Sequence, residues 1–250
     1  MDPVFGRLKL GTSLLAMADL ALPRECCVCG RTLLLHERHI CTTCLSKLPE
    51  THFFLLEHNP MADKFNAAIA SGCDVYEPYS RAAALFFYNS SSNYRKIPQL
   101  LKYGRNFSEG KYFASMLGGR LAQSPIFADV DTVIPVPLHW ARRLSRGYNQ
   151  AEVIARAVAA ALPGAEIRTD ILRRSRSTRT QTRLSVEEKK SNVEGAFRAK
   201  DKAAAAKHIL LVDDVFTTGA TLSSCYRTLR AELGPEVRIS VATLGVVGCQ

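Results

Sequence analysis

The segment that most constrains the fold is HILLVDDVFTTGAT, residues 208–221. Its first five residues, HILLV, form the short apolar run that is typical of a strand buried on both faces of a sheet. Because a carboxylate without partners is too costly inside a sheet, we expect the strand to end at Val212. Asp213 and Asp214 would then lie at its carboxyl edge, which is where ligands bind in open α/β sheets.

The residues after the two aspartates form a pattern that is typical of a phosphate-binding turn. Their amides, their hydroxyls and the dipole of the helix expected over 220–232 can together hold a phosphate. The residues of this turn are Thr217, Thr218, Gly219, Ala220 and Thr221. Asp213 and Asp214 can accept hydrogen bonds from the hydroxyls of a ribose 5-phosphate, or hold a hydrated Mg²⁺ shared with a diphosphate. The alternative is a helix start in which one acid and one threonine act as caps.

Strands and helices alternate along most of the chain. We expect strands over 82–88, 131–137 and 237–247, and helices over 94–103, 109–122 and 149–161. This alternation predicts an α/β fold with a parallel, doubly wound sheet. Residues 51–80 are expected to be irregular, and 168–183, which contain six arginines, to form a mobile basic loop.

Four cysteines form two CxxC pairs, Cys26 with Cys29 and Cys41 with Cys44, separated by eleven residues. Thiolates at positions i and i+3 can face one tetrahedral ion, so the two pairs predict a closed, structural zinc site. The alternative is two disulfides, as in a secreted protein. Cys27 can replace Cys26 only by shortening the first pair to CxC, and we therefore keep Cys26 as the ligand.

A composition break near Pro49 divides the chain into residues 1–50, an amphipathic helix followed by a zinc knuckle, and residues 51–250, the α/β domain. Asp19 and the lack of a cleavage pattern argue against a signal peptide. With no run of 18 apolar residues, we expect a cytoplasmic protein without membrane insertion. The net charge of +10 favours an anionic partner such as nucleic acid, a phosphate ester or pyrophosphate.

VDDVFTTGAT resembles the phosphoribosyl pyrophosphate (PRPP) loop of type I phosphoribosyltransferases. Further segments are similar to those of the ComF family, which includes ComFC and GntX-like proteins, and they follow in order over nearly the whole chain. They are the two CxxC pairs, LLKYGR (100–105), VIPVPLHWARRLSRGYNQAE (133–152), QTRL (181–184) and NVEGAF (192–197). Two positions depart from the pattern: Phe216 is bulkier than the usual aliphatic residue, and Lys189 stands where an arginine is expected.

The resemblance implies a type I phosphoribosyltransferase fold whose flexible hood comes from the basic loop. It also implies that Mg²⁺-bound PRPP is held by Asp213, Asp214 and the turn from Thr217 to Thr221. Arg142, Arg143 and Arg146 would bind pyrophosphate, because the planar guanidinium contacts two phosphate oxygens at once. Lys102 and Gln181 lie in segments that resemble family motifs and are further candidates for this site.

Two functions follow from the resemblance. In the first, which we favour, the protein is a PRPP-dependent transferase of nucleoside metabolism or DNA uptake, whose acceptor the residues do not name. Thr217 stands where hypoxanthine-type enzymes have an aspartate, which argues against that class of acceptor. In the second, the protein is a non-catalytic competence factor that uses the fold to bind PRPP or single-stranded DNA and contacts the competence machinery.

Overall fold

The computed structural model describes residues 22–71, 77–89, 91–103, 107–139, 143–144, 147–175, 195–200 and 206–249. The chain divides into two compact units, Met1–Leu48 and Pro49–Gln250. The helix predicted near the amino terminus lies outside the described residues, apart from Leu22 at its end. Each unit is described by itself below.

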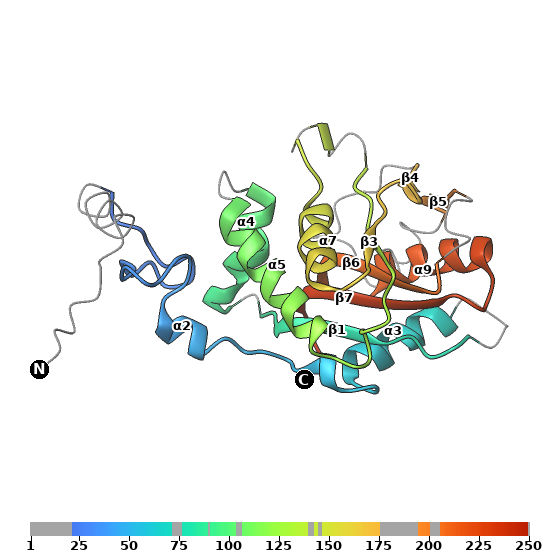
Figure 1. Ribbon diagram of the computed structural model, residues 1–250, viewed down its shortest axis with the longest axis horizontal. Helices are drawn as coiled ribbons and strands as arrows, with labels where there is room; N and C mark the ends of the chain where they lie inside the picture. The colour runs from blue at the N-terminus through green and yellow to red at the C-terminus, as the bar shows by residue number, and fades with distance from the viewer. Residues whose placement is uncertain are drawn as a thin grey trace, which may run out of the picture. The chain divides into compact units, whose positions relative to one another are not determined.

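The larger unit is built on a five-stranded parallel sheet with the order β1–β7–β6–β2–β3 (Figure 1). Its strands are β1 (Ala82–Phe87), β2 (Thr132–Pro135), β3 (Glu166–Ile167), β6 (His208–Phe216) and β7 (Arg238–Val246). The predicted α/β class with a parallel sheet is therefore confirmed. The strands at 82–88, 131–137 and 237–247 are confirmed to within two residues at each end.

Helices cover both faces of this sheet (Figure 1). They are α3 (Pro60–Ala70), α4 (Lys96–Tyr103), α5 (Phe107–Ala122), α7 (Gln150–Ala161) and α9 (Ala220–Leu233), with short 3₁₀ turns η1 (Phe53–Leu55) and η2 (Asn93–Arg95). In β6, Ile209 and Leu211 belong to the core cluster that includes residues of α3 and α9. Because side chains alternate along a strand, Leu210 and Val212 point to the opposite face, where α7 packs against β6.

Three aromatic side chains form the centre of the core between α3, α9 and the sheet. The ring of Phe65 lies 6.4 Å from that of Phe216 and 5.9 Å from that of Tyr226, in both cases edge to face. All three side chains are buried. Such pairs add to the free energy gained from burial alone, and they tie the end of β6 to both helices.

The expectation of irregular chain over residues 51–80 is wrong, because α3 occupies the middle of this segment. The Asn59 side chain caps the helix by accepting a hydrogen bond from the Ala62 amide at 3.0 Å, and Pro60 occupies the first turn. Met61, Phe65 and Ile69 follow at intervals of four and are buried. The signal was present in the sequence as an asparagine cap, a proline at the first helical position and a helical apolar period.

The expectation of a loop over residues 168–183 is wrong for part of its length. β4 (Leu172–Arg174) pairs antiparallel with β5 (Phe197–Ala199) in a separate two-stranded sheet. Leu172 and Phe197 are buried in the same core as α9, which explains why a strand forms despite the basic neighbours. Residues 176–183 of the predicted loop lie outside the described part of the chain.

Within the described residues, none of the helices combines the length and the apolar character that crossing a membrane requires.

Candidate functional site

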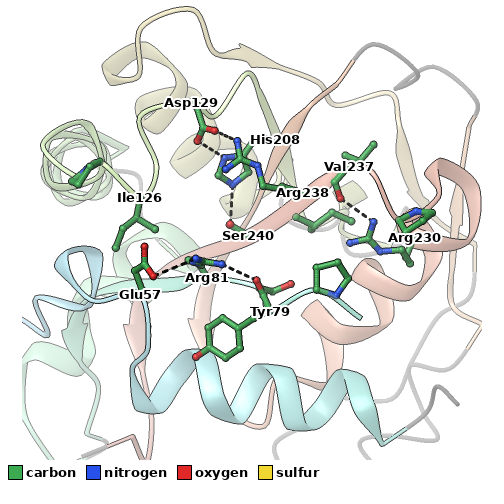
Figure 2. Close-up of a pocket in the computed structure, with 15 residues that line it drawn as sticks. Glu57, Tyr79, Arg81, Ile126, Asp129, His208, Arg230, Val237, Arg238 and Ser240 are labelled. Carbon is green, nitrogen blue, oxygen red and sulfur yellow. Dashed lines mark hydrogen bonds and ion pairs between the residues drawn. The ribbon is translucent and has the colours of Figure 1, made fainter. Parts of the chain in front are cut away.

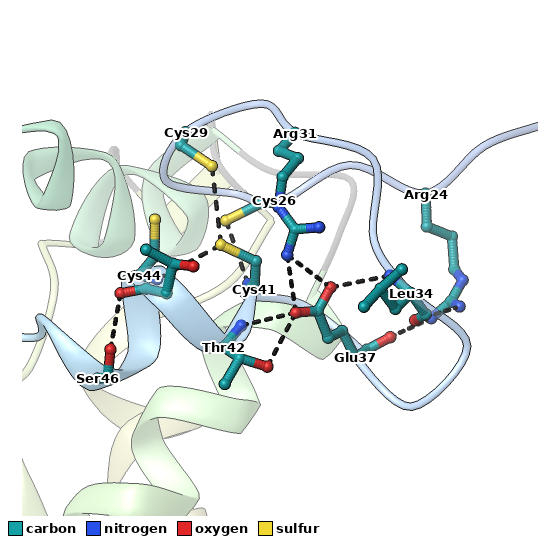
Figure 3. A network of polar contacts seen from close by, with 11 residues as sticks. Arg24, Cys26, Cys29, Arg31, Leu34, Glu37, Cys41, Thr42, Cys44 and Ser46 are labelled. Atoms are coloured by element: carbon teal, nitrogen blue, oxygen red, sulfur yellow. Dashed lines mark hydrogen bonds and ion pairs between the residues drawn. The ribbon is translucent and has the colours of Figure 1, made fainter.

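The four predicted ligand cysteines converge in the smaller unit (Figure 3). The Sγ atoms of Cys26, Cys29, Cys41 and Cys44 all lie within 4.8 Å of one another, and those of Cys29 and Cys41 are 3.8 Å apart. Zinc–sulfur bonds of about 2.3 Å in a tetrahedron place the sulfurs about 3.8 Å apart. The four thiols are thus close enough to hold a metal ion, and their number and type are consistent with structural zinc. Cys27 lies outside this cluster.

Local polar groups favour the thiolate form of Cys41. Burial alone would raise the pKa of this thiol, but hydrogen bonds from the Cys44 amide, the Arg31 side chain and neighbouring thiols outweigh burial and lower the pKa to about 6. The Cys44 amide nitrogen lies 3.4 Å from Cys41 Sγ, at the start of α2 (Thr42–Ser46). Since the thiolate is the form that binds metal, this arrangement favours metal binding near neutral pH.

A buried carboxylate that the sequence did not single out joins the two halves of the knuckle (Figure 3). Glu37 accepts hydrogen bonds from the Leu34 amide at 2.8 Å, the Thr42 amide at 2.7 Å and the Thr42 hydroxyl at 3.0 Å. The two amides, followed by the Thr42 hydroxyl and the charge of Arg31, lower the pKa of Glu37 to about 2. The only signal in the sequence is a single acid between the CxxC pairs. By contrast, His36 is exposed.

In the larger unit, Asp213 and Asp214 lie inside β6 rather than after it. β6 continues to Phe216, with Asp213 paired to Thr243 of β7, whereas β2 ends at Pro135 opposite Val212. Asp213 accepts a hydrogen bond from the Asp214 amide at 2.9 Å, and Asp214 accepts one from the Val215 amide at 2.8 Å. The prediction that the strand ends at Val212 is therefore wrong. The carboxylates are tolerated because they are only half-buried and are hydrogen-bonded to the backbone beyond the end of β2.

The predicted phosphate-binding turn joins β6 to α9. Gly219 is the N-cap of α9 and has a φ of 76°, a conformation that favours glycine. The Ala220 amide donates to the Thr218 hydroxyl at 3.4 Å. A Cβ added at Gly219 would lie 3.0 Å from the ring of Phe216, so this bulky residue packs directly beneath the turn. With no acidic residue in the first turn of α9, the amide end of the helix keeps its positive potential.

The start of α7 carries two buried polar residues, Asn149 and Gln150. The side chain of Asn149 accepts a hydrogen bond from the Ala151 amide at 3.3 Å and donates one to the Val136 carbonyl at 3.0 Å, so Asn149 is a cap that also ties α7 to the end of β2. Gln150 is buried, and its Nε2 has no hydrogen-bond partner within the described residues. A buried amide without a partner is costly, and it marks a position where a further polar group is expected.

A pocket of about 290 Å³ opens at the carboxyl end of β2, between the start of α7 and β4. It brings Arg143 of the predicted pyrophosphate set together with Arg173 and Arg174 of the predicted hood. The other lining residues are Pro135, Pro137, Leu138, Asn149, Glu152, Thr169 and Leu172. Glu152 lies 3.9 Å from the Arg143 guanidinium. Asp213, Asp214 and the turn after β6 do not contribute to this lining.

Several predicted site residues lie outside the described part of the chain. These are Arg142, Arg146, Gln181 and the side chain of Lys102. The departure at Lys189 lies outside it as well.

The comparisons with known proteins are consistent with the motifs. No family model matches the chain. The chain is 26% identical over 217 residues to "DNA utilization protein YhgH" of Salmonella typhi, covering 84% of this chain and 92% of that protein. It is 27% identical over 220 residues to "Competence protein ComFC" of Bacillus subtilis, covering 85% and 86%. "Competence protein F" of Haemophilus influenzae is 35% identical over 108 residues, 42% of this chain and less than half, 46%, of that relative's length. These relatives support the ComF family, which the motifs predicted for this chain.

Proposed function

We propose that this protein binds Mg²⁺-PRPP at the carboxyl end of β6 and acts in competence or DNA utilisation as a phosphoribosyltransferase. The observation that carries the proposal is the juxtaposition of two half-buried carboxylates, Asp213 and Asp214, with a glycine-capped helix start at Gly219. The names of the relatives, competence proteins and DNA utilization proteins, support the cellular role.

Each part of the proposed site has a chemical task. The amides and hydroxyls of Thr217, Thr218 and Thr221 bind the 5-phosphate, with the positive end of the α9 dipole behind them. Asp213 and Asp214 accept hydrogen bonds from the ribose hydroxyls or hold the hydrated metal ion. Mg²⁺, when bound, neutralises charge that develops on the departing pyrophosphate.

The arginines of the 290 Å³ pocket would complete the site. Arg143, Arg142 and Arg146 would bind pyrophosphate, with Lys102 and Gln181 as further candidate contacts. The buried amide of Gln150 offers a donor at the start of α7 that a phosphate oxygen can satisfy. In the reaction, the bond from ribose C1 to pyrophosphate breaks as an acceptor nucleophile bonds to C1 from the opposite face. The acceptor stays unnamed.

In the smaller unit, we infer that Cys26, Cys29, Cys41 and Cys44 hold a structural zinc ion. Four protein ligands leave no position for substrate or water. The ion would therefore stabilise a unit that is too small to bury a large core of its own, without taking part in the transfer reaction.

Calorimetric titration with Mg²⁺ and PRPP tests the proposed PRPP site. We expect wild-type protein to bind and the double variant Asp213→Asn/Asp214→Asn to bind at least about tenfold more weakly, since each lost charged contact costs about 1.5 kcal/mol or more. Glu232→Gln/Glu236→Gln changes the charge equally at exposed positions and should bind like wild type. Undiminished binding by the aspartate variant would remove the assignment. Release of pyrophosphate with amine or nucleobase acceptors then separates turnover from binding alone.

A second function, binding of single-stranded DNA, is favoured by the gathering of Arg143, Arg173 and Arg174 around one pocket. If these side chains contact phosphates, affinity falls steeply with salt, with a slope in log–log form of about −0.7 per phosphate contact. The pair Arg173→Ala/Arg174→Ala should weaken binding and flatten this slope. The exposed pair Arg95→Ala/Arg156→Ala should do neither. Equal effects of the two pairs would leave only non-specific attraction to a basic protein.

A further inference from the structure

A second pocket, of about 260 Å³ (Figure 2), lies at the amino ends of the parallel strands, the opposite edge of the sheet from Asp213. It is formed where β1, β6 and β7 begin, and its lining includes Arg81, His208, Arg238 and Ser240. We call it the amino-edge pocket. Because all three strands are parallel, this edge is remote from the carboxyl-end site proposed above.

Three polar residues of this pocket form one hydrogen-bonded chain (Figure 2). His208 Nδ1 lies 2.7 Å from Asp129 Oδ1, and His208 Nε2 lies 2.8 Å from Ser240 Oγ. The strand register explains the second contact. His208 pairs with Arg238, and Ser240 is two residues further along β7, so His208 and Ser240 point to the same face of the sheet.

The carboxylate determines which way the protons point. A carboxylate only accepts, so Asp129 requires a proton on His208 Nδ1. Burial lowers the pKa of His208 to about 4, so the ring is neutral at pH 7. Nε2 of a neutral ring with a proton on Nδ1 is an acceptor, and the Ser240 hydroxyl must therefore donate to it. The geometry is that of a serine whose proton is already directed at a base.

The two ends of this hydrogen-bonded series differ in solvent exposure. Ser240 and His208 are almost fully buried but border the pocket, whereas the Asp129 side chain is half-exposed and also pairs with Arg238. Arg81 lines the same pocket, held near Glu57 at 3.5 Å. Arg81 and Arg238 therefore line the same pocket as Ser240. Cationic N–H donors of this kind stabilise an oxygen that gains negative charge.

We propose that the amino-edge pocket is an acyl-transfer site, in which Ser240 is the nucleophile, His208 the general base and Asp129 a positioning residue. The substrate class is a small carboxylic ester, whose acyl group fits a pocket of this volume. The inference is independent of PRPP binding, because the two sites lie at opposite edges of the sheet.

The reaction balances without any cofactor. Ser240 Oγ bonds to the acyl carbon while its proton passes to His208 Nε2, and the same proton then leaves with the departing alcohol as the ester bond breaks. Water, deprotonated by His208, attacks the acyl-serine, and the proton returns to Ser240 Oγ as the free acid is released. Arg81 and Arg238 supply positive charge for the oxyanion at each attack.

The first experiment is reaction of the full-length protein with a fluorophosphonate probe, followed by mass spectrometry of the peptides. We expect one adduct, on Ser240. Labelling should disappear in Ser240→Ala and become at least about a hundredfold slower in His208→Gln, since a general base contributes about 10²-fold or more. Ser80→Ala is the matched control, because Ser80 is also buried and lines the same pocket, and it should label like wild type.

A second variant keeps the proposal testable if Ser240→Ala fails to fold. Ser240→Cys places a thiol of similar size beside His208, and it should react with iodoacetamide faster than the buried Cys225 and Cys249. Hydrolysis of p-nitrophenyl acetate should follow the labelling across the variants and survive Asp213→Asn/Asp214→Asn. No adduct on Ser240, or equal labelling rates in wild type and His208→Gln, would overturn the proposal and leave a purely structural network.

Discussion

The guanidinium of Arg31 lies 2.8 Å and 3.0 Å from the two carboxylate oxygens of Glu37. Both residues lie in the segment between the two cysteine pairs of the knuckle. Glu37 is also bound by the backbone amides of Leu34 and Thr42. One buried carboxylate thus connects the first CxxC loop to the helix that follows Cys41. Arg31 also helps to lower the pKa of the Cys41 thiol, so the network extends to a predicted metal ligand.

Glu37→Gln is expected to weaken metal retention by about 10- to 100-fold, the usual effect of removing a group that orients metal ligands. The variant loses the negative charge that holds Arg31, although its shape is conserved. Transfer of zinc to a chromophoric chelator measures the effect. Glu25→Gln is the control, because Glu25 belongs to the same unit and is exposed. Equal zinc transfer from both variants would mean that Glu37 does not organise the site.

Replacing cysteines one at a time distinguishes Cys26 from its neighbour Cys27. We expect Cys26→Ser to lower bound zinc from about one ion per chain to well below one, because a closed site needs four ligands. Cys27→Ser should retain zinc, since its thiol lies outside the cluster of four. Elemental analysis of the purified proteins measures both. Zinc lost from Cys27→Ser and kept by Cys26→Ser would reverse the assignment.

Gly219→Ala is expected to lower the free energy of unfolding by about 1–2 kcal/mol, because an alanine at positive φ is strained. The added Cβ would also press on the Phe216 ring, 3.0 Å away. Gly119→Ala in α5 is the matched control, since a Cβ there meets nothing within 4 Å and alanine favours a helix by about 0.5–1 kcal/mol. Urea unfolding of both variants tests this, and a destabilised Gly119→Ala would contradict it.

His208 predicts a dependence of stability on pH. Burial, with a smaller effect of Arg81 and against the charge of Asp131, lowers its pKa from 6.5 to about 4; Asp129 and Arg238 also face this region. Between these values the unfolded chain takes up a proton that the folded chain does not. The free energy of unfolding should therefore fall as pH falls from 6.5 to 4, by up to about 3 kcal/mol in total, and this contribution should be constant above pH 6.5.

Urea unfolding of wild type and His208→Gln over this pH range isolates the contribution from that of other groups. The difference between the two proteins should change between pH 6.5 and 4 and stay constant above. His36→Gln, at an exposed position, should follow wild type. Parallel curves for wild type and His208→Gln would show that the histidine has the same pKa in both states.

The end of β6 shows which structural features could be predicted from the sequence and which could not. The change from HILLV to two aspartates correctly indicates where burial decreases, since Asp213 to Val215 are only half-buried. It does not indicate where pairing ends, because β7 continues beside β6 after β2 has stopped at Pro135. Burial depends on the polarity of a segment's own side chains, which can be read from the sequence. Strand pairing depends on the length of the neighbouring strand, which cannot.

The sequence by itself determined the class of the fold and the cluster of four cysteines. Both depend on short-range relations: apolar runs that alternate with helical segments, and thiols three residues apart. Only the tertiary structure decided that Glu37 is buried between the cysteine pairs and that Asp129, His208 and Ser240 meet at one pocket. His208 is 79 residues from Asp129 and 32 from Ser240 along the chain, so their contact exists only once parallel strands are paired in register.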